Sequence, residues 1–244
     1  MWCRILAGEL VVLSMAVRSI SSYVSQEFRR LQHSDIPRVF SGMVFENCHF
    51  LNCSLIQDED VLYPIRVQDV TVSDGGLVNC NAIGVRFENV VLDNCQAVGD
   101  PMSPAGCVFG GVRLRGMLGS WIFNDMDPSL SDSVRTDFRE AEREFYNEVD
   151  FALDISEGVF ESADMYYLPG DLVVRDPETQ VLIRKGSLAV ADISQLPRRA
   201  VRILERVKNN PFDCTVLVVG RARKDFDEAL EEVRMLVECG IAER

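Results

Sequence analysis

A bulky apolar residue recurs at every fifth position along much of this 244-residue chain. The two runs, in different frames, are Phe40, Phe45, Phe50, Leu55 and then Val67, Val72, Leu77, Ala82, Phe87, Leu92, Ala97. Small residues stand two positions before many of these: Cys48, Cys53, Gly75, Cys80, Cys95 and Cys107. A helix repeats every 3.6 residues and a strand every two, so a period of five fits neither and indicates internal repetition.

The segments GMVFENCHFLNCSL and GGLVNCNAIGVRFENVVLDNCQA resemble the pentapeptide-repeat family, whose unit reads A-(D/N)-(L/F)-x-x. The resemblance implies a right-handed β-helix in which four units form one square coil. It also implies that the large residue and the small residue two before it face inward, where stacked coils pack them closely. Valine or cysteine often replaces alanine, and the frame slips at DEDVLYPI and GDPMSPAG.

We therefore expect a mainly β fold with some α-structure, organised in three parts. Residues 1–37 are predicted to form an N-terminal amphipathic capping helix, and residues 38–193 a pentapeptide-repeat-like β-helix. A polar helical pattern at about 129–148 (SLSDSVRTDFREAEREFYNE) is expected to interrupt the repeat and to lie against its wall. Residues 194–244 are predicted to form a small helical or α/β module.

The N-terminal helix is predicted over 5–31, because apolar residues recur there at spacings of three and four. They are Leu6, Leu10, Leu13, Val17, Ile20, Val24, Phe28 and Leu31. One interpretation places this stripe across the open end of the β-helix. A second makes it a homodimer seam, and a third a membrane-surface helix. A signal peptide lacks a convincing cleavage site, and the apolar stretch is too short to span a bilayer.

Two interpretations of the C-terminal module remain open. In the first, CTVLVV (214–219) is a buried strand between two helices, the second opened by a capping box of Asp225 and Glu228 and closed by Gly240. In the second, RILERV and EEVRMLVECGIAER resemble a winged-helix domain, which would require 216–219 to be helical.

The cysteines are expected to be reduced and unpaired, because Cys48, Cys53, Cys80, Cys95 and Cys107 occupy inward positions as small apolar residues. A cytoplasmic, bacterial protein is the simplest interpretation. With no CxxC pattern and only His33 and His49, neither a metal nor a cofactor is predicted.

Catalytic motifs of the hydrolase, P-loop, dinucleotide-binding and metalloprotease types are missing from the sequence, so we expect no enzyme activity. Asp125 and Asp127 are expected to belong to a polar turn. The one candidate site is the basic run Arg221, Arg223 and Lys224 before a helix N-terminus, where an anion or a partner could bind. Nearby acidic residues favour a solvated linker instead.

The predicted function is protein–protein interaction or scaffolding on a rigid surface. The net charge of −13 makes nucleic acid an unlikely partner. One alternative is an acidic DNA mimic that modulates a topoisomerase, although 38–127 holds only eleven acidic residues against five basic ones. Another is a transcription regulator that uses a winged-helix-like unit. The sequence identifies neither the protein partner nor the oligomeric state.

Overall fold

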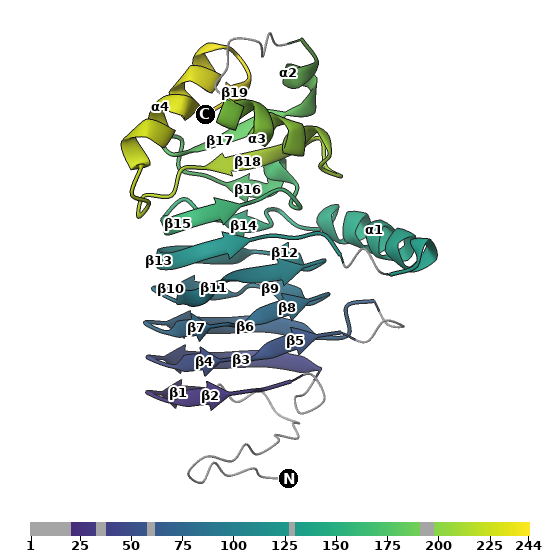
Figure 1. Ribbon diagram of the computed structural model, residues 1–244. Helices are drawn as coiled ribbons and strands as arrows, with labels where there is room; N and C mark the ends of the chain where they lie inside the picture. The colour runs from purple at the N-terminus through teal and green to yellow at the C-terminus, as the bar shows by residue number, and fades with distance from the viewer. Residues whose placement is uncertain (1–20, 33–37, 58–61, 127–129, 191–197) are drawn as a thin grey trace.

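The computed structural model describes residues 21–32, 38–57, 62–126, 130–190 and 198–244. The described strands form a parallel β-sheet that curves as a half-barrel, with few helices. Figure 1 shows the strands stacked in layers from β1 and β2 at one end. Helix α1 lies beside the middle layers, and α2, α3 and α4 gather at the far end (Figure 1).

Short strands alternate with long ones in the lower layers. They are β1 (Ser21–Val24), β2 (Glu27–Arg29), β3 (Val39–Glu46), β4 (His49–Leu51), β5 (Ser54–Ile56), β6 (Arg66–Ser73), β7 (Gly76–Val78), β8 (Asn81–Ile83), β9 (Arg86–Glu88), β10 (Val91–Asp93), β11 (Gln96–Ala105), β12 (Val108–Gly110) and β13 (Val112–Ile122).

The upper elements mix short strands with helices. They are α1 (Asp132–Tyr146), β14 (Leu153–Asp154), β15 (Gly158–Asp164), the 3₁₀-helix η2 (Gly170–Leu172), β16 (Val173–Val174), β17 (Gln180–Arg184), α2 (Lys185–Val190), α3 (Arg198–Lys208), β18 (Cys214–Val218), α4 (Phe226–Glu238) and β19 (Ala242–Glu243).

Each lower strand pairs in parallel with a strand one layer further along the chain. In one ladder Met43 pairs with Val70, in the next step Val72 pairs with Leu92, and Leu92 then pairs with Leu114. In a second ladder β4, β7 and β11 align in register, and in a third β5, β8 and the end of β11 do so. The stacking brings residues some two dozen positions apart into direct contact.

The five-residue series occupies the inner side of these ladders. Its large members are partly buried and pack against one continuous apolar cluster: Phe40, Phe45, Phe50, Leu55, Leu77, Phe87 and Leu92. The rings stack from layer to layer, with Phe28 and Phe50 centred 5.1 Å apart and Phe87 and Phe109 5.4 Å apart. Cys48 and Cys95 are fully buried beside them. The spacing therefore identified the residues that pack inside.

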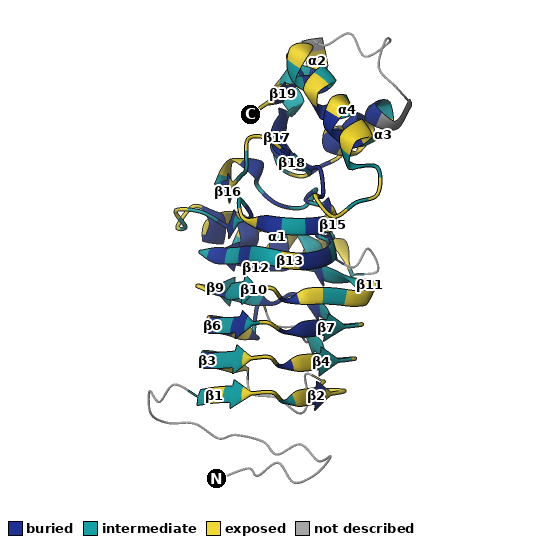
Figure 2. Ribbon diagram, turned by 90° about the vertical axis from the view of Figure 1, so that its left-hand side faces the viewer, coloured by how far each residue is buried: buried dark blue, intermediate teal, exposed yellow. Residues whose placement is uncertain are grey.

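The corners between strands place a residue in the left-handed backbone region. Seven positions spaced by five have positive φ angles: Asp69, Asp74, Asn79, Gly84, Asn89, Asn94 and Gly99. Asparagine, aspartate and glycine tolerate this conformation best. Corner side chains also bond between layers, since the Asn94 amide donates to Asp74 at 3.3 Å and that of Asn89 to Asp69 at 3.1 Å. Figure 2 shows the corners as exposed links between β3 and β4 and between β6 and β7.

The predicted right-handed β-helix is wrong, since the structure has a parallel sheet curved as a half-barrel. Regular square coils need equal short strands, but β3, β6, β11 and β13 run for 8 to 11 residues. These long strands pair with different neighbours along their length; β6, for example, pairs with β9 through Val67 and with β10 through Val72. The upper strands β17, β18 and β19 then pair in antiparallel fashion.

The N-terminal capping helix is also wrong where the structure describes it. Residues 21–24 and 27–29 are strands β1 and β2, paired with β3 and β4. Tyr23 stacks on Phe45 at 5.0 Å, so the aromatic ladder begins here. The rest of the predicted helix, 5–20, lies outside the described residues. The helical seam predicted there does not form over 21–29, which are strands, and a homodimer stays a prediction.

Helix α1 lies within the predicted 129–148 and packs on β12. Phe138 is completely buried, and the Phe145 ring contacts Gly110 of β12. Arg86 of β9 places its guanidinium 4.7 Å from the centre of the same ring. The Ser131 hydroxyl caps the helix by accepting from the Val134 amide. This amphipathic helix therefore buries one face against the strands and leaves its other side chains at the surface.

The C-terminal module contains a strand where the winged-helix alternative required a helix. Residues 214–218 form β18, paired in antiparallel register with β17 from Gln180 to Arg184. Helices α2, α3 and α4 enclose a second apolar cluster that includes Leu188, Leu204 and Leu236. The α/β interpretation thus describes this module, and the winged-helix interpretation is wrong.

Candidate functional site

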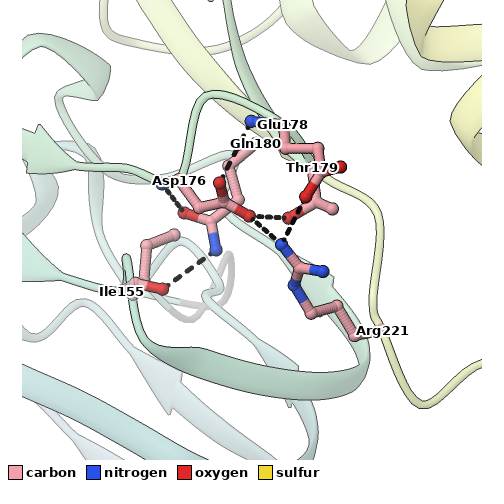
Figure 3. Close-up of polar contacts among 6 residues, drawn as sticks. All are labelled: Ile155, Asp176, Glu178, Thr179, Gln180 and Arg221. Atoms are coloured by element: carbon pink, nitrogen blue, oxygen red, sulfur yellow. Dashed lines mark hydrogen bonds and ion pairs between the residues drawn. The ribbon is translucent and has the colours of Figure 1, made fainter.

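The predicted basic run lies in the loop between β18 and α4. Figure 3 shows Arg221 facing the loop between β16 and β17. Its guanidinium donates to the Asp176 carboxylate at 2.6 Å and to the Glu178 carboxylate at 3.0 Å. An incoming anion would have to displace both carboxylates. The predicted anion contact is therefore already occupied at Arg221.

Asp176 organises the loop that receives Arg221 (Figure 3). The Thr179 hydroxyl donates to its carboxylate at 2.6 Å, and the Glu178 amide donates at 3.1 Å. Its own amide donates to the Gln180 side chain at 2.9 Å, and the Gln180 amide group donates in turn to the carbonyl of Ile155. The cluster thus connects β14, β17 and the β18–α4 loop by satisfied hydrogen bonds, which is the behaviour of a structural joint.

The electrostatics of Asp176 agree with this role. Burial disfavours its charged form, but hydrogen bonds from Thr179, the Glu178 amide and Arg221 together lower the pKa of the carboxyl below its ordinary value. The bonds that Arg221 donates to the Asp176 and Glu178 carboxylates raise the pKa of Arg221. At neutral pH the Asp176 carboxyl therefore stays ionised and the Arg221 guanidinium stays protonated, so neither group transfers a proton.

The other two predicted residues point elsewhere. Arg223 forms a two-pronged pair with Asp225, at 2.6 and 2.8 Å. Lys224 is exposed. Because Asp225 turns to Arg223, its side chain makes no capping bond to α4, and the predicted capping box with Glu228 does not form. The structure therefore does not bring the three basic residues together.

A groove of about 440 Å³ lies along α1. Its lining residues are Asp125, Met126, Asp132, Arg135, Thr136, Arg139, Glu140 and Arg143. Arg139 pairs with Asp125 and with Glu142, while Arg135 pairs with Asp132 at 2.6 Å. Acidic and basic side chains are balanced in this lining. The residues therefore predict no preference for an anionic or a cationic ligand. The predicted polar turn at Asp125 is thus tied to α1, and Asp127 lies outside the described residues.

Glu142 is the most buried carboxylate near that groove. Its side chain is 6% exposed and bonds Arg139 at 2.8 Å. Burial raises the pKa of Glu142, and burial also raises the pKa of the nearby Tyr63 phenol. Neither Glu142 nor Tyr63 has a hydrogen-bonded nucleophile beside it among the described residues. In the same part of the chain, no three His, Cys, Asp or Glu side chains lie close enough together to hold a metal.

The most distinctive surface is the outer side of β4, β5, β7, β8 and both ends of β11, which we name the uncharged wall. In-register columns on it are Leu51–Val78–Val98, Ile56–Ile83–Ala105, His49–Gly76–Gln96 and Ser54–Asn81–Ser103. None of these residues is Asp, Glu, Lys or Arg, in a chain that is 26% charged. Val98 is 47% exposed, and β11 shows its exposed stretch in Figure 2. Sequence analysis missed this wall, although the positions flanking each inward residue carry the signal.

The outer residues of β6, β9, β10 and β13 differ sharply from this wall. Asp93 lies in register with Arg115, and Arg86 bonds Glu88 at 2.7 and 2.8 Å. Charges of both signs are therefore interleaved on that side, and α1 covers part of it.

Comparison with known proteins gives no further guide. No protein-family model matches the chain, and neither a curated protein nor a solved structure does. The pentapeptide-repeat resemblance thus stays a prediction from the sequence. In the described part of the chain, no helix has the length and apolar character needed to cross a membrane.

Proposed function

We propose that this protein is a non-enzymatic binding or scaffold protein of the cytoplasm, and that its partner is a protein that docks on the uncharged wall. The observation that carries the proposal is the column Leu51–Val78–Val98 on strands held in parallel register. Cores of protein–protein interfaces are depleted in charged residues, as this surface is. A surface built on paired strands is also rigid, so binding costs little ordering entropy.

Two features of the surrounding residues suit such a site. Corner residues Asn52 and Asn79 lie between the two apolar columns and are exposed, with the Asn79 amide group donating to Asn52 at 3.4 Å. They add to the polar groups of the His49 and Ser54 columns, and the exposed Asp100 of β11 lies beside Asn79, whose side-chain oxygen accepts from the Asp100 amide. Arg29 and Glu27 stand at the β2 end of the wall and supply a charged rim.

The DNA-mimic alternative receives less support. Mimicry of a duplex needs a continuous row of acidic groups, but Asp93 has Arg115 beside it and Glu88 is bonded to Arg86. The transcription-regulator alternative depended on the winged-helix interpretation, which β18 excludes. Protein binding is the function that the geometry favours.

The test compares affinity capture from the native host by wild type, Val98→Asp and the control Val174→Asp. Val174 is 43% exposed but lies on β16, away from the wall. A partner that docks on the wall should be captured by wild type and by the control. Once purified, it should bind Val98→Asp at least about tenfold more weakly, because a buried charge in an interface costs more than about 1.4 kcal/mol. Equal affinity for all three folded proteins would refute the proposal.

A further inference from the structure

Two cysteines lie at equivalent positions on adjacent layers. Ser54 and Asn81 are the first registered pair of β5 and β8, and Cys53 and Cys80 directly precede them. The Asn81 amide donates to the Cys53 carbonyl at 3.2 Å, which keeps the two backbones adjacent. Neighbouring strands run about 4.8 Å apart. This separation falls within the Cα spacing of about 4.4–6.8 Å that disulfides span.

Both thiols point to the same inner corner. Cys53 donates to the carbonyl of Phe28 at 3.4 Å, and Cys80 donates to the carbonyl of Phe50 at 3.3 Å. Phe28 and Phe50 are themselves in register, so the sulfur atoms occupy matching places one layer apart. The two thiols are therefore neighbours across a single layer spacing.

Cys53 differs in acidity from the other inward cysteines whose pKa is shifted. The interaction with Cys80 outweighs burial and lowers the pKa of Cys53 to about 7, while the same interaction and burial raise the pKa of Cys80. Burial instead raises the pKa of Cys95 and of Cys107 to about 12. Cys53 is also only partly buried. It is therefore the inward cysteine with both thiolate character and access to solvent, the two requirements for reaction with an oxidant.

We propose that Cys53 and Cys80 form a reversible dithiol–disulfide pair that a peroxide oxidises. The Cys53 thiolate attacks one peroxide oxygen, the O–O bond breaks, and the leaving hydroxide takes up a proton to become water. The Cys80 sulfur then attacks the sulfenic sulfur of Cys53, the S–O bond breaks, and a second water leaves as the S–S bond forms. The two thiols lose two electrons and two protons in all, and the peroxide is reduced to two waters.

The structure contains its own negative control. Cys48 and Cys95 lie in an analogous column, but Gly75 stands between them, because His49 pairs with Gly76 and Gly76 with Gln96. Two layer spacings of about 4.8 Å each separate these cysteines, beyond the disulfide range. Oxidation should therefore be specific to Cys53 and Cys80 among the inward cysteines.

The test uses the full chain with Cys3→Ser and Cys239→Ser, because Cys239 is exposed and Cys3 lies outside the described residues. After reduction and exposure to hydrogen peroxide, intact mass should fall by about 2 Da, and peptide mapping should recover a Cys53–Cys80 cross-link that dithiothreitol removes. Adding Cys80→Ser should prevent the mass loss and let dimedone trap a sulfenic acid on Cys53. Adding Cys53→Ser should prevent both products.

A folded protein whose mass is unchanged by peroxide would overturn the proposal, as would a cross-link that maps to Cys48 and Cys95. Circular dichroism of each variant distinguishes lost chemistry from a lost fold. If a serine variant fails to fold, the alkylation rates of the parent protein decide. Iodoacetamide should then modify Cys53 at least about tenfold faster than Cys95 at pH 7, as the thiolate fraction requires, and equal rates would count against the pair.

Discussion

The lower layers and the C-terminal module solve the problem of burying apolar residues in different ways. The lower cluster grows by stacking, so Val67, Val72 and Leu114 each meet a neighbour from the next layer. The upper cluster is enclosed by helices α2, α3 and α4 and includes Leu204 and Leu236. One part is therefore built from the same strand pairing repeated in each layer, and the other from helices packed around a single cluster.

The antiparallel strands between the two clusters belong to both. On β17, Leu182 packs into the lower cluster, while Val181 and Ile183 pack into the upper one. On β18, Val216 and Val218 face the lower cluster, and Leu217 faces the upper. A strand buried on both faces reads as a continuous apolar run. This explains why VLI and CTVLVV lack the five-residue pattern seen below them.

The largest expected effect tests whether the two clusters unfold together. Leu236→Ala should lower the free energy of unfolding by about 2–5 kcal/mol, because Leu236 is 1% exposed and its loss leaves a cavity. Hydrogen exchange should show faster exchange in α3 and α4 while β6 and β10 keep their protection.

The matched control is Leu114→Ala, which removes an equally buried leucine from the lower cluster. It should accelerate exchange in β10 and β13 first. If both variants accelerate exchange across the whole chain to the same extent, the two regions form a single cooperative unit and the comparison fails.

A smaller effect is expected at the joint between the regions. Asp176→Asn should destabilise the protein by about 1–3 kcal/mol, because it removes a charge-assisted bond to Arg221 in a side chain that is 16% exposed. The folded pKa of Asp176 is lowered, so its contribution is present above the unfolded pKa of about 3.9 and is lost as pH falls through the folded value.

Urea denaturation of wild type and Asp176→Asn at several pH values measures this directly. The stability gap between the two proteins should be constant near neutral pH and should narrow below pH of about 4. A gap that stays constant into acid would show that Asp176 does not stabilise the joint through its charge.

The smallest effect concerns the corners of the lower layers. Asn94→Ala should cost about 1–2 kcal/mol, because alanine tolerates the left-handed region poorly, and Asn94 has φ of +49° there. Asn94→Gly keeps the conformation and loses only the bonds to Asp74 and to the Met117 amide. Thermal unfolding should therefore rank wild type above the glycine variant and the glycine variant above the alanine variant. The reverse order for the two variants would show that the left-handed backbone conformation does not control the stability of the corner.

The sequence predicted which residues of the lower layers pack inward, because packing repeats with the same period as the side chains. It misassigned residues 21–29 because their spacing of three and four also fits a helix. Tyr23 and Phe28 are five apart, however, and they continue the series through Phe45 and Phe50. The local sequence of 21–29 fits a helix and a strand equally well. Pairing with β3 and β4, which lie further along the chain, makes these residues strands.

The candidate site was less predictable than the core. Arg221 was a candidate anion contact, but its partner depends on where the loop at Asp176 lies, 45 residues earlier in the chain. Arg223, in contrast, pairs with Asp225 only two residues away. The uncharged wall was overlooked because no single residue in it is unusual. Only the register between layers places Leu51, Val78 and Val98 in one column.

The position of α1 has a consequence for how the chain finds its fold. Leu92 pairs with Leu114, 22 residues later, whereas Val112 pairs with Leu153, 41 residues later, because α1 lies in the intervening segment. Loop-closure entropy grows only with the logarithm of length, so this longer step costs about half a kcal/mol more than an ordinary one. The 19 extra residues therefore add little entropic cost to the pairing of β13 with β14, and what α1 contributes to the lower layers is the packing of Phe138 and Phe145.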